Sequence, residues 1–225
     1  MENKKPRVKN YFHAVCLAAV VGLVCACATS PNKNYNAFRE SHPRSILVMP
    51  PVNRTVDINA SATFLSTSTI PLAESGYYVI PVALSTETFR QNGITVAEDA
   101  HAIDFRRLRE IFGADSALYI TITRFGSIYR VVSADVEVDA FAKLVDLKTG
   151  QEIWSGRAFL NSGGNNSLND DSLLGILLNA AIDQIANTLS NKAHEVGKEA
   201  NNRMLSARYS GGILFGPYHP KYGTD

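Results

Sequence analysis

Residues 117–160 read ALYITITRFGSIYRVVSADVEVDAFAKLVDLKTGQEIWSGRAFL, and this stretch decides the fold. Residues 117–125 are rich in strong β formers, and residues 131–147 alternate between apolar and polar side chains. An alternation with period two puts the apolar side chains on one face of a strand. Asp146 to Gly150 is a turn signal, after which residues 152–160 return as a strand. The stretch therefore predicts a three-stranded antiparallel meander.

Shorter elements are expected upstream of the meander. Ser45 to Pro50 is an apolar run with β-branched members, typical of a strand buried on both faces, and Tyr77 to Pro81 predicts a second strand. Helices are expected at residues 60–73, 84–91 and 102–112. Pro71 is a difficulty for the last turn of the first helix, and Gly113 is the expected end of the third.

Downstream of the meander, a loop at residues 161–167 leads to a helix that begins at Ser172 and carries an apolar face to Leu189. The helical pattern fades through the charged stretch at residues 194–203. The whole order predicts an α/β (α+β) domain over residues 45–208, with a mixed sheet of about five strands and helices packed on it.

The N-terminus has the pattern of an export signal. Four basic residues precede an apolar run at residues 14–26, which is too short to span a membrane. The alternative is a short buried helix. The run ends Val24-Cys-Ala-Cys27, which resembles the bacterial lipobox. We therefore expect a signal peptide at residues 1–26 and a lipid on Cys27. Ala28 in place of aspartate favours the outer membrane, by resemblance to sorted lipoproteins.

Removal of residues 1–26 changes the charge of the chain. The mature chain keeps 22 − 4 = 18 Lys and Arg against 21 − 1 = 20 Asp and Glu, a net charge of −2. Nucleic-acid binding, which needs a clearly basic face, is not expected. Cys27 is then the single cysteine, so no disulfide and no cysteine-based metal site can form. Residues 27–44 are polar and turn-prone, and predict a flexible tether.

Motifs whose spacing is fixed by a catalytic mechanism do not occur in the chain. There is no G-x-S-x-G elbow, no phosphate-binding glycine loop and no H-E-x-x-H helix. The acidic pairs Glu98-Asp99 and Asp170-Asp171 lie where acids favour a helix start. We therefore predict no enzymatic activity, no metal and no cofactor.

Two stretches are candidate partner-binding sites. Asn53, Arg54 and Thr55 follow the first strand at the edge where binding groups gather in α/β folds, although they can equally satisfy the backbone of a turn. The tail at residues 209–225 is rich in aromatic residues and glycine, with Phe215 and Tyr218 as candidates. Its apolar groups either pack on the domain itself or are presented to a partner.

These motifs also carry a family resemblance. The segment Ile46-Leu-Val-Met-Pro-Pro-Val-Asn-Arg-Thr55 and the hairpin Ala142–Ser155 resemble the periplasmic domains of CsgG-like and LpoB-like outer-membrane lipoproteins. With the lipobox and the tail, the chain resembles neisserial-type lipoproteins of unknown function that are found beside CsgG-like genes. The resemblance implies a TolB-N-terminal-like or anticodon-binding-like fold and work in the cell envelope. The chain lacks the pair of long amphipathic hairpins that builds a CsgG pore.

Three functions follow as hypotheses. The first is a non-enzymatic outer-membrane lipoprotein, facing the periplasm or the cell surface, that docks envelope proteins such as a CsgG-like lipoprotein; its oligomeric state is open. The second is an LpoB-like activator of peptidoglycan synthesis, for which residues 28–44 span at most about 60 Å. The third is a small-ligand binder or hydrolase, which requires a pocket containing two or more of the following residues: Asp99, His101, Asp115 and Glu152.

The lipid anchor gives the first testable prediction. In the native host, mass spectrometry of the mature N-terminus is expected to find a chain that begins at Cys27 and carries acyl groups. A chain that still begins at Met1, or an unmodified Cys27, contradicts the anchor.

Overall fold

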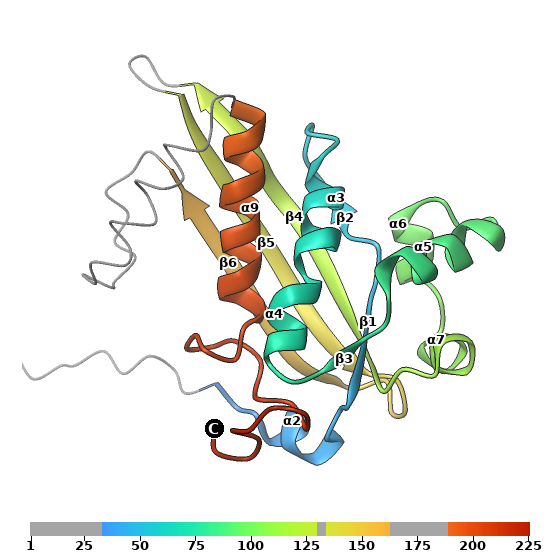
Figure 1. Ribbon diagram of the computed structural model, residues 1–225. Helices are drawn as coiled ribbons and strands as arrows, with labels where there is room; N and C mark the ends of the chain where they lie inside the picture. The colour runs from blue at the N-terminus through green and yellow to red at the C-terminus, as the bar shows by residue number, and fades with distance from the viewer. Residues whose placement is uncertain (1–32, 130–133, 163–188) are drawn as a thin grey trace, which may run out of the picture. The chain divides into compact units, whose positions relative to one another are not determined.

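The predicted meander is the central part of the computed structural model, which describes residues 33–129, 134–162 and 189–225 (Figure 1). It consists of β4 (Ser116–Tyr129), β5 (Ala134–Asp146) and β6 (Glu152–Asn161), paired antiparallel in this order. One register shift interrupts the β4–β5 ladder, between Ile122 and Arg124. The meander is therefore confirmed, and β4 is longer than its apolar run indicates.

Parallel strands extend the meander into a mixed sheet. β1 (Ser45–Val48) lies between β4 and β3 (Tyr78–Val79) and is parallel to both. β2 (Val52–Asn53) continues beyond β1 and pairs in parallel with β4. The sheet has six strands in the order β3-β1-β4-β5-β6, with β2 off this path. The predicted mixed sheet is confirmed, with the short β2 added.

The described helices include those expected at residues 60–73, 84–91 and 102–112, with different bounds, and two that were not predicted, at residues 36–41 and 97–101. They are α2 (Asn36–Ser41), α3 (Ala60–Thr67), α4 (Thr69–Glu74), α5 (Val82–Gln91), α6 (Ala97–His101), α7 (Phe105–Phe112) and α9 (Leu189–Leu205). The helix expected at residues 60–73 is broken at Ser68, which puts Pro71 in the first turn of α4, where a missing N–H costs nothing. Asp104 caps α7 by accepting a hydrogen bond from the Arg106 N–H, and Gly113 ends it at φ 65°.

The end of the chain corrects another expectation. Residues 194–203, where the helical pattern fades, lie inside α9. Its buried face consists mainly of small side chains, and Gly197 lies so close to the sheet that an added Cβ would be 2.7 Å from the Phe125 ring. Most of the loop expected at residues 161–167 lies outside the described residues. Almost all of the helix expected from Ser172 lies outside them as well.

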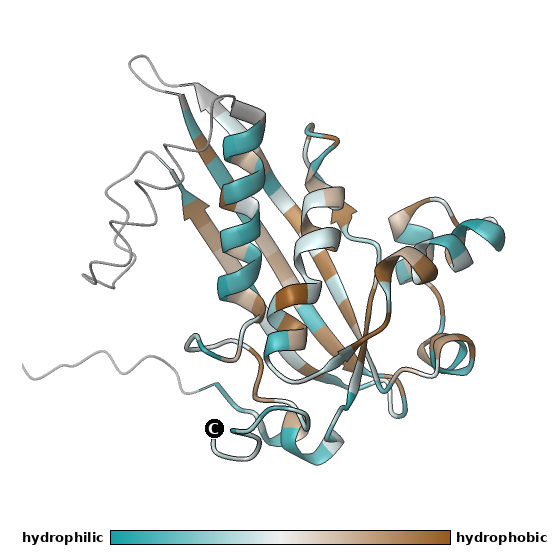
Figure 2. Ribbon diagram, in the orientation of Figure 1, coloured by the Kyte–Doolittle hydropathy of each residue, from teal (hydrophilic) through white to brown (hydrophobic). Residues whose placement is uncertain are grey.

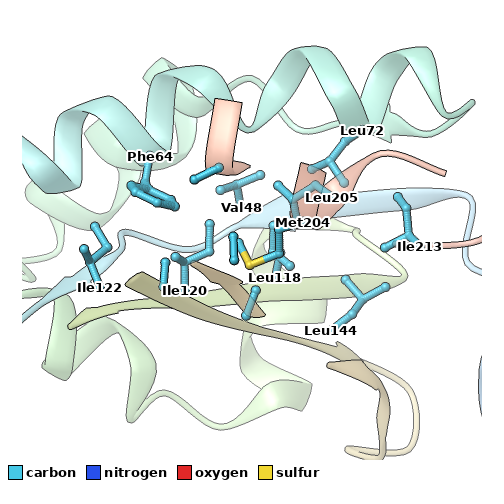
Figure 3. Packing of buried hydrophobic residues seen from close by; sticks show 14 of the residues in the cluster. Val48, Phe64, Leu72, Leu118, Ile120, Ile122, Leu144, Met204, Leu205 and Ile213 are labelled. Carbon is cyan, nitrogen blue, oxygen red and sulfur yellow. The ribbon is translucent and has the colours of Figure 1, made fainter. Parts of the chain in front are cut away.

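The main core lies between the sheet and α3, α4 and α9, which cover one face (Figures 1 and 3). Phe64 of α3, Leu72 of α4 and Met204 of α9 pack there on alternate residues of the strands. The strand residues of this core are fully or almost fully buried: Ile46, Val48, Leu118, Ile120, Ile122 and Leu144. Burial of each such side chain contributes about 1.5–3 kcal/mol.

A second core on the other face involves α5, α6 and α7. Leu47 and Met49 lie there, between the residues that face the main core, so β1 is buried on both faces as predicted. Phe89 of α5 and Leu108 of α7 complete this core. Figure 2 shows that the strands of the sheet carry many hydrophobic residues, whereas the outer faces of the helices are more hydrophilic.

The folded part begins earlier than expected. Residues 27–44 are predicted to be a tether, yet Tyr35–Asp225 forms one compact unit, because Phe38 of α2 is buried in the main core between Tyr35 and Tyr77. Residues 33–34 precede this unit, and Cys27 and the expected signal peptide lie outside the described residues. Among the described residues, no helix is long and apolar enough to cross a membrane.

The C-terminal tail packs on its own domain through backbone carbonyls. The Gly212 carbonyl accepts hydrogen bonds from Tyr35 Oη at 2.6 Å and Trp154 Nε1 at 2.9 Å. The Leu214 carbonyl accepts one from Tyr77 Oη at 2.7 Å. Burial raises the pKa of Tyr77 well above its usual value, so the phenol keeps its proton and donates. The tail therefore joins α2, β6 and the α4–β3 turn.

Asn201 of α9 holds the break between α3 and α4. Its side chain is fully buried, and Nδ2 lies within 3.0 Å of the Phe64 carbonyl, Thr67 Oγ1 and Ser68 Oγ. The hydroxyls of Thr67 and Ser68 already donate to carbonyls of α3, so they act as acceptors toward the Asn201 amide. The two N–H groups of this amide are shared among the three acceptors, of which the Phe64 carbonyl and Ser68 Oγ are buried.

Asn201→Ala is expected to lower the free energy of unfolding by about 2–3 kcal/mol, because buried acceptors lose their donor. Urea denaturation measures this change. The matched control is Asn202→Ala, one residue further along α9 and half-buried, which is expected to change stability by less than about 0.5 kcal/mol. Equal effects of the two substitutions would contradict this role for Asn201.

Candidate functional site

The loop at residues 53–59, here called the distal loop, is held by its own side chains. Asn53 Oδ1 accepts hydrogen bonds from the Thr55 N–H at 2.9 Å and from Thr55 Oγ1 at 2.8 Å. Asn53 Nδ2 donates to the Asp57 carbonyl at 2.8 Å, and the Asn59 N–H donates to Asp57 Oδ1 at the same distance. These bonds form successive Asx turns, which fix the backbone of the loop.

The fixed backbone presents two aliphatic side chains to solvent. Val56 is 100% exposed and Ile58 is 87% exposed. Beside them, Arg54 forms an ion pair with Glu98 of α6 at 3.5 Å, and both side chains are largely exposed, so the pair contributes little to stability. Two neighbouring apolar side chains on an ordered loop, with charged groups around them, are typical of a contact surface.

Asn53, Arg54 and Thr55, the residues predicted as a partner-binding site, lie in or beside this loop, and partner binding by them stays a prediction. Asn53 and Thr55 satisfy the turn, as the structural alternative proposed, and Arg54 lies at the rim. The exposed Val56 and Ile58 were missed. Their signal was two aliphatic residues alternating with polar ones in a segment that fits neither a helix nor a buried strand.

The predicted tail residues lie at the other end of the sheet. The Gly216 N–H donates to the Ser75 carbonyl at 2.7 Å, and the Tyr218 N–H donates to the Gly76 carbonyl at 3.1 Å. Phe215 is half-buried and its ring stacks on His219 with 4.2 Å between the ring centroids. Tyr218 remains 66% exposed. Most of the tail therefore belongs to the domain, while Tyr218 is available to a partner.

The distal loop and the tail are separate sites. Ser41 of α2 donates to Asp146, which pairs with Ser116 at the start of β4, and Asp57 lies beside Gly126 near the end of β4. Ten residues of strand correspond to about 30 Å. The structure therefore does not bring Asn53, Arg54 and Thr55 together with Phe215 and Tyr218.

The face of β4, β5 and β6 opposite α9 has ion pairs and aromatic rings. Arg157 donates to both carboxylate oxygens of Asp139 at 2.9 Å, and its guanidinium lies 4.7 Å from the Phe141 ring centroid. Arg124 donates through Nη1 to one carboxylate oxygen of Glu137 on the neighbouring strand. The hydrogen bonds from Arg157 hold the pKa of the nearly buried Asp139 below its usual value. Phe141 and Phe159 stay about two-fifths exposed on this face.

His101 and Asp115, two of the residues considered for a ligand pocket, form hydrogen bonds with the backbone of the domain. His101 Nε2 donates to the Pro50 carbonyl at 2.8 Å, and burial lowers its pKa, so the ring is neutral at pH 7. Asp115 accepts from the backbone of Arg44 and Ser45. Cavities of about 210, 330 and 380 Å³ lie between described elements, and none of Asp99, His101, Asp115 and Glu152 lines them. Within the described ranges, no three His, Cys, Asp or Glu side chains gather as metal ligands.

This geometry defines a mixed α/β domain with exposed aliphatic side chains at one end and exposed tyrosines at the other. The family model described as "Putative lipoprotein GNA1162-like" matches residues 33–218, and the chain belongs to this lipoprotein family. It is 45% identical over 202 residues to lipoprotein NMB1124/NMB1162 of Neisseria meningitidis serogroup B, covering 89% of this chain and 93% of that protein.

Two solved structures resemble this chain to different extents. The crystal structure of lipoprotein GNA1162 from Neisseria meningitidis is 46% identical, with a TM-score of 0.53, and the match covers 65% of this chain and all of that one. The LpoB C-terminal domain from Salmonella enterica is 17% identical with a TM-score of 0.34, over 63% of this chain and 91% of that one. The fold class is therefore that of the GNA1162 structure.

Arg157→Leu is expected to lower the free energy of unfolding at pH 7, because the buried Asp139 loses its hydrogen-bonding partner. The folded-state pKa of Asp139 is depressed, so the stabilisation is present above its unfolded value of about 4 and is lost as the pH falls. The gap between wild type and variant is therefore expected to be smaller at pH 3 than at pH 7.

Urea denaturation at the two pH values measures this. Arg106→Leu is the control, because Arg106 and its partner Asp104 are both largely exposed. A gap that does not change with pH would contradict the role of Asp139.

Proposed function

We propose that this chain is a non-enzymatic lipoprotein of the outer membrane, anchored through acyl groups on Cys27, which docks a protein partner of an envelope assembly or export system. The observation that carries the proposal is the distal loop, with Val56 and Ile58 exposed on a hydrogen-bonded backbone. Preorganised apolar side chains lose little conformational entropy on binding. Membership of a lipoprotein family supports the anchor.

The position of the distal loop favours a protein over the anchoring membrane as its partner. The folded unit begins at Tyr35, at the end of the sheet near Ser116. The distal loop lies about 30 Å further along β4. An anchored domain that meets the bilayer at its first residues therefore carries Val56 and Ile58 on the opposite end, toward the space that other envelope proteins occupy.

The start of the folded unit at Tyr35 also argues against an LpoB-like role in peptidoglycan synthesis. Because Tyr35 already belongs to the folded unit, the link from Cys27 spans at most about 28 Å, where residues 28–44 would have spanned about 60 Å. A short link keeps the domain near its membrane. This supports a partner that comes within about one domain length of the membrane.

Site-specific photocrosslinking in the native host tests the docking surface. A photoreactive residue at position 56 is expected to form a discrete adduct with one envelope protein. The substitution Ile58→Ser is expected to weaken that adduct by about tenfold, because a buried aliphatic contact contributes roughly 1.5 kcal/mol.

Leu84 of α5 provides the matched control, since it is 62% exposed and lies outside the distal loop. A photoreactive residue there is expected to give no such adduct, and Leu84→Ser is expected to leave the adduct at position 56 unchanged. Adducts of equal strength at positions 56 and 84, or none at position 56, would refute the docking site.

A further inference from the structure

The end of the domain opposite the distal loop exposes several tyrosines. This surface, here called the tether end, consists of residues 35–44 and 206–225, which hydrogen bonds from Tyr35 to Gly212 and from Arg39 to Asp225 hold together. Tyr218 is 66% exposed, and Tyr209 and Tyr222 are each more than two-fifths exposed. Tyrosine has an apolar ring and a polar hydroxyl, which suits it to the boundary between lipid headgroups and water.

The tether end also concentrates positive charge. It contains four basic side chains (Arg39, Arg44, Arg208 and Lys221) and two acidic ones (Glu40 and Asp225), a net charge of 4 − 2 = +2. The mature chain as a whole has −2, so the rest of it has −4. Glu74 lies 3.6 Å from Arg208 and offsets its charge, so the exposed Arg39, Arg44 and Lys221 are the cations that remain.

We infer that the tether end lies on an anionic phospholipid surface, which orients the domain on its membrane; the inference rests on the proposed anchor at Cys27. The link from Cys27 to Tyr35 reaches at most about 28 Å, so the tether end stays within reach of the headgroups. Basic side chains then gain from the negative surface potential, and the tyrosine rings enter the interface.

The tether end is held in a fixed shape for this contact. The Tyr218 N–H donates to the Gly76 carbonyl, and an alanine Cβ at Gly76 would lie 2.5 Å from His219 Cβ. Lys221 lies above the Phe215 ring, with its Nζ 5.8 Å from the centroid, and Arg39 Nη2 donates to the Asp225 carbonyl at 2.9 Å. Binding therefore requires little reordering of the tail. A lipid anchor together with a basic, aromatic patch provides the two signals that stable membrane attachment needs.

Fluorescent labels on the lipidated mature protein test the orientation. Cys27 is the single cysteine after residue 26 and its thiol is acylated, so one introduced cysteine accepts a label selectively. The chains Tyr218→Cys and Ile58→Cys are labelled and reconstituted into vesicles of phosphatidylethanolamine and phosphatidylglycerol with a quencher on the lipid headgroup. Quenching is expected to be several times greater at position 218 than at position 58.

Variants that remove one positive charge test whether the tether end binds anionic phospholipid. On the unlipidated Cys27→Ser chain, Lys221→Gln is expected to lower partitioning onto these vesicles by about fivefold, the effect of one cation near an anionic surface. Lys198→Gln on α9 is the matched control, because Lys198 is 55% exposed and lies outside the tether end. Phosphatidylcholine vesicles are expected to abolish the difference between the two variants.

The outcomes separate this inference from the proposed anchor. Equal quenching at positions 218 and 58 on a chain whose acylation is verified by mass spectrometry overturns the orientation and leaves the anchor intact. An unmodified Cys27 overturns the anchor, and the partitioning of the Cys27→Ser chain then still decides whether the tether end binds lipid. Equal losses from Lys221→Gln and Lys198→Gln would refute specific lipid contact.

Discussion

The antiparallel pairing of β4 with β5 is the constraint on which the rest of the structure depends. Because side chains alternate along a strand, this pairing assigns Leu118, Ile120 and Leu144 to the face that α3, α4 and α9 cover. It also places Glu137 and Asp139 on the opposite face, where arginines from β4 and β6 pair with them. One register therefore determines both the apolar core and the charged face of the sheet.

The register shift after Ile122 changes that assignment along β4. Ile122 and Phe125 both face the main core although they are three residues apart, which an uninterrupted strand does not allow. The shift brings Phe125 against Phe64 of α3, with 6.4 Å between ring centroids, and under Gly197 of α9. It also leaves Arg124 exposed beside Glu137. A local irregularity thus makes room for the close approach of α9 to the sheet.

The hydrophobic periodicity of the sequence predicted the elements in which buried residues repeat regularly. It failed where contacts between residues distant in the sequence determine the bounds of an element. The meander and β1 follow from periodicity, whereas α9 was underestimated because its buried face is made of small residues. The predicted tether extends too far into the domain, since Phe38 is buried in the main core beside Tyr77, a residue that lies far away in the sequence. At the distal loop, polarity pointed to Asn53 and Thr55, which serve the turn, while exposure shows that Val56 and Ile58 are the free side chains.

The topology also explains why the two surfaces lie at opposite ends. β1 and β2 run parallel to β4, so the chain enters beside Ser116 and reaches the distal loop only after it has passed along most of the sheet. Since Trp154, Tyr35 and Tyr77 hold the tail at the level where the chain enters, both ends of the folded unit lie together. The first and last residues of the folded unit therefore lie at one end of the sheet, and the distal loop lies at the other.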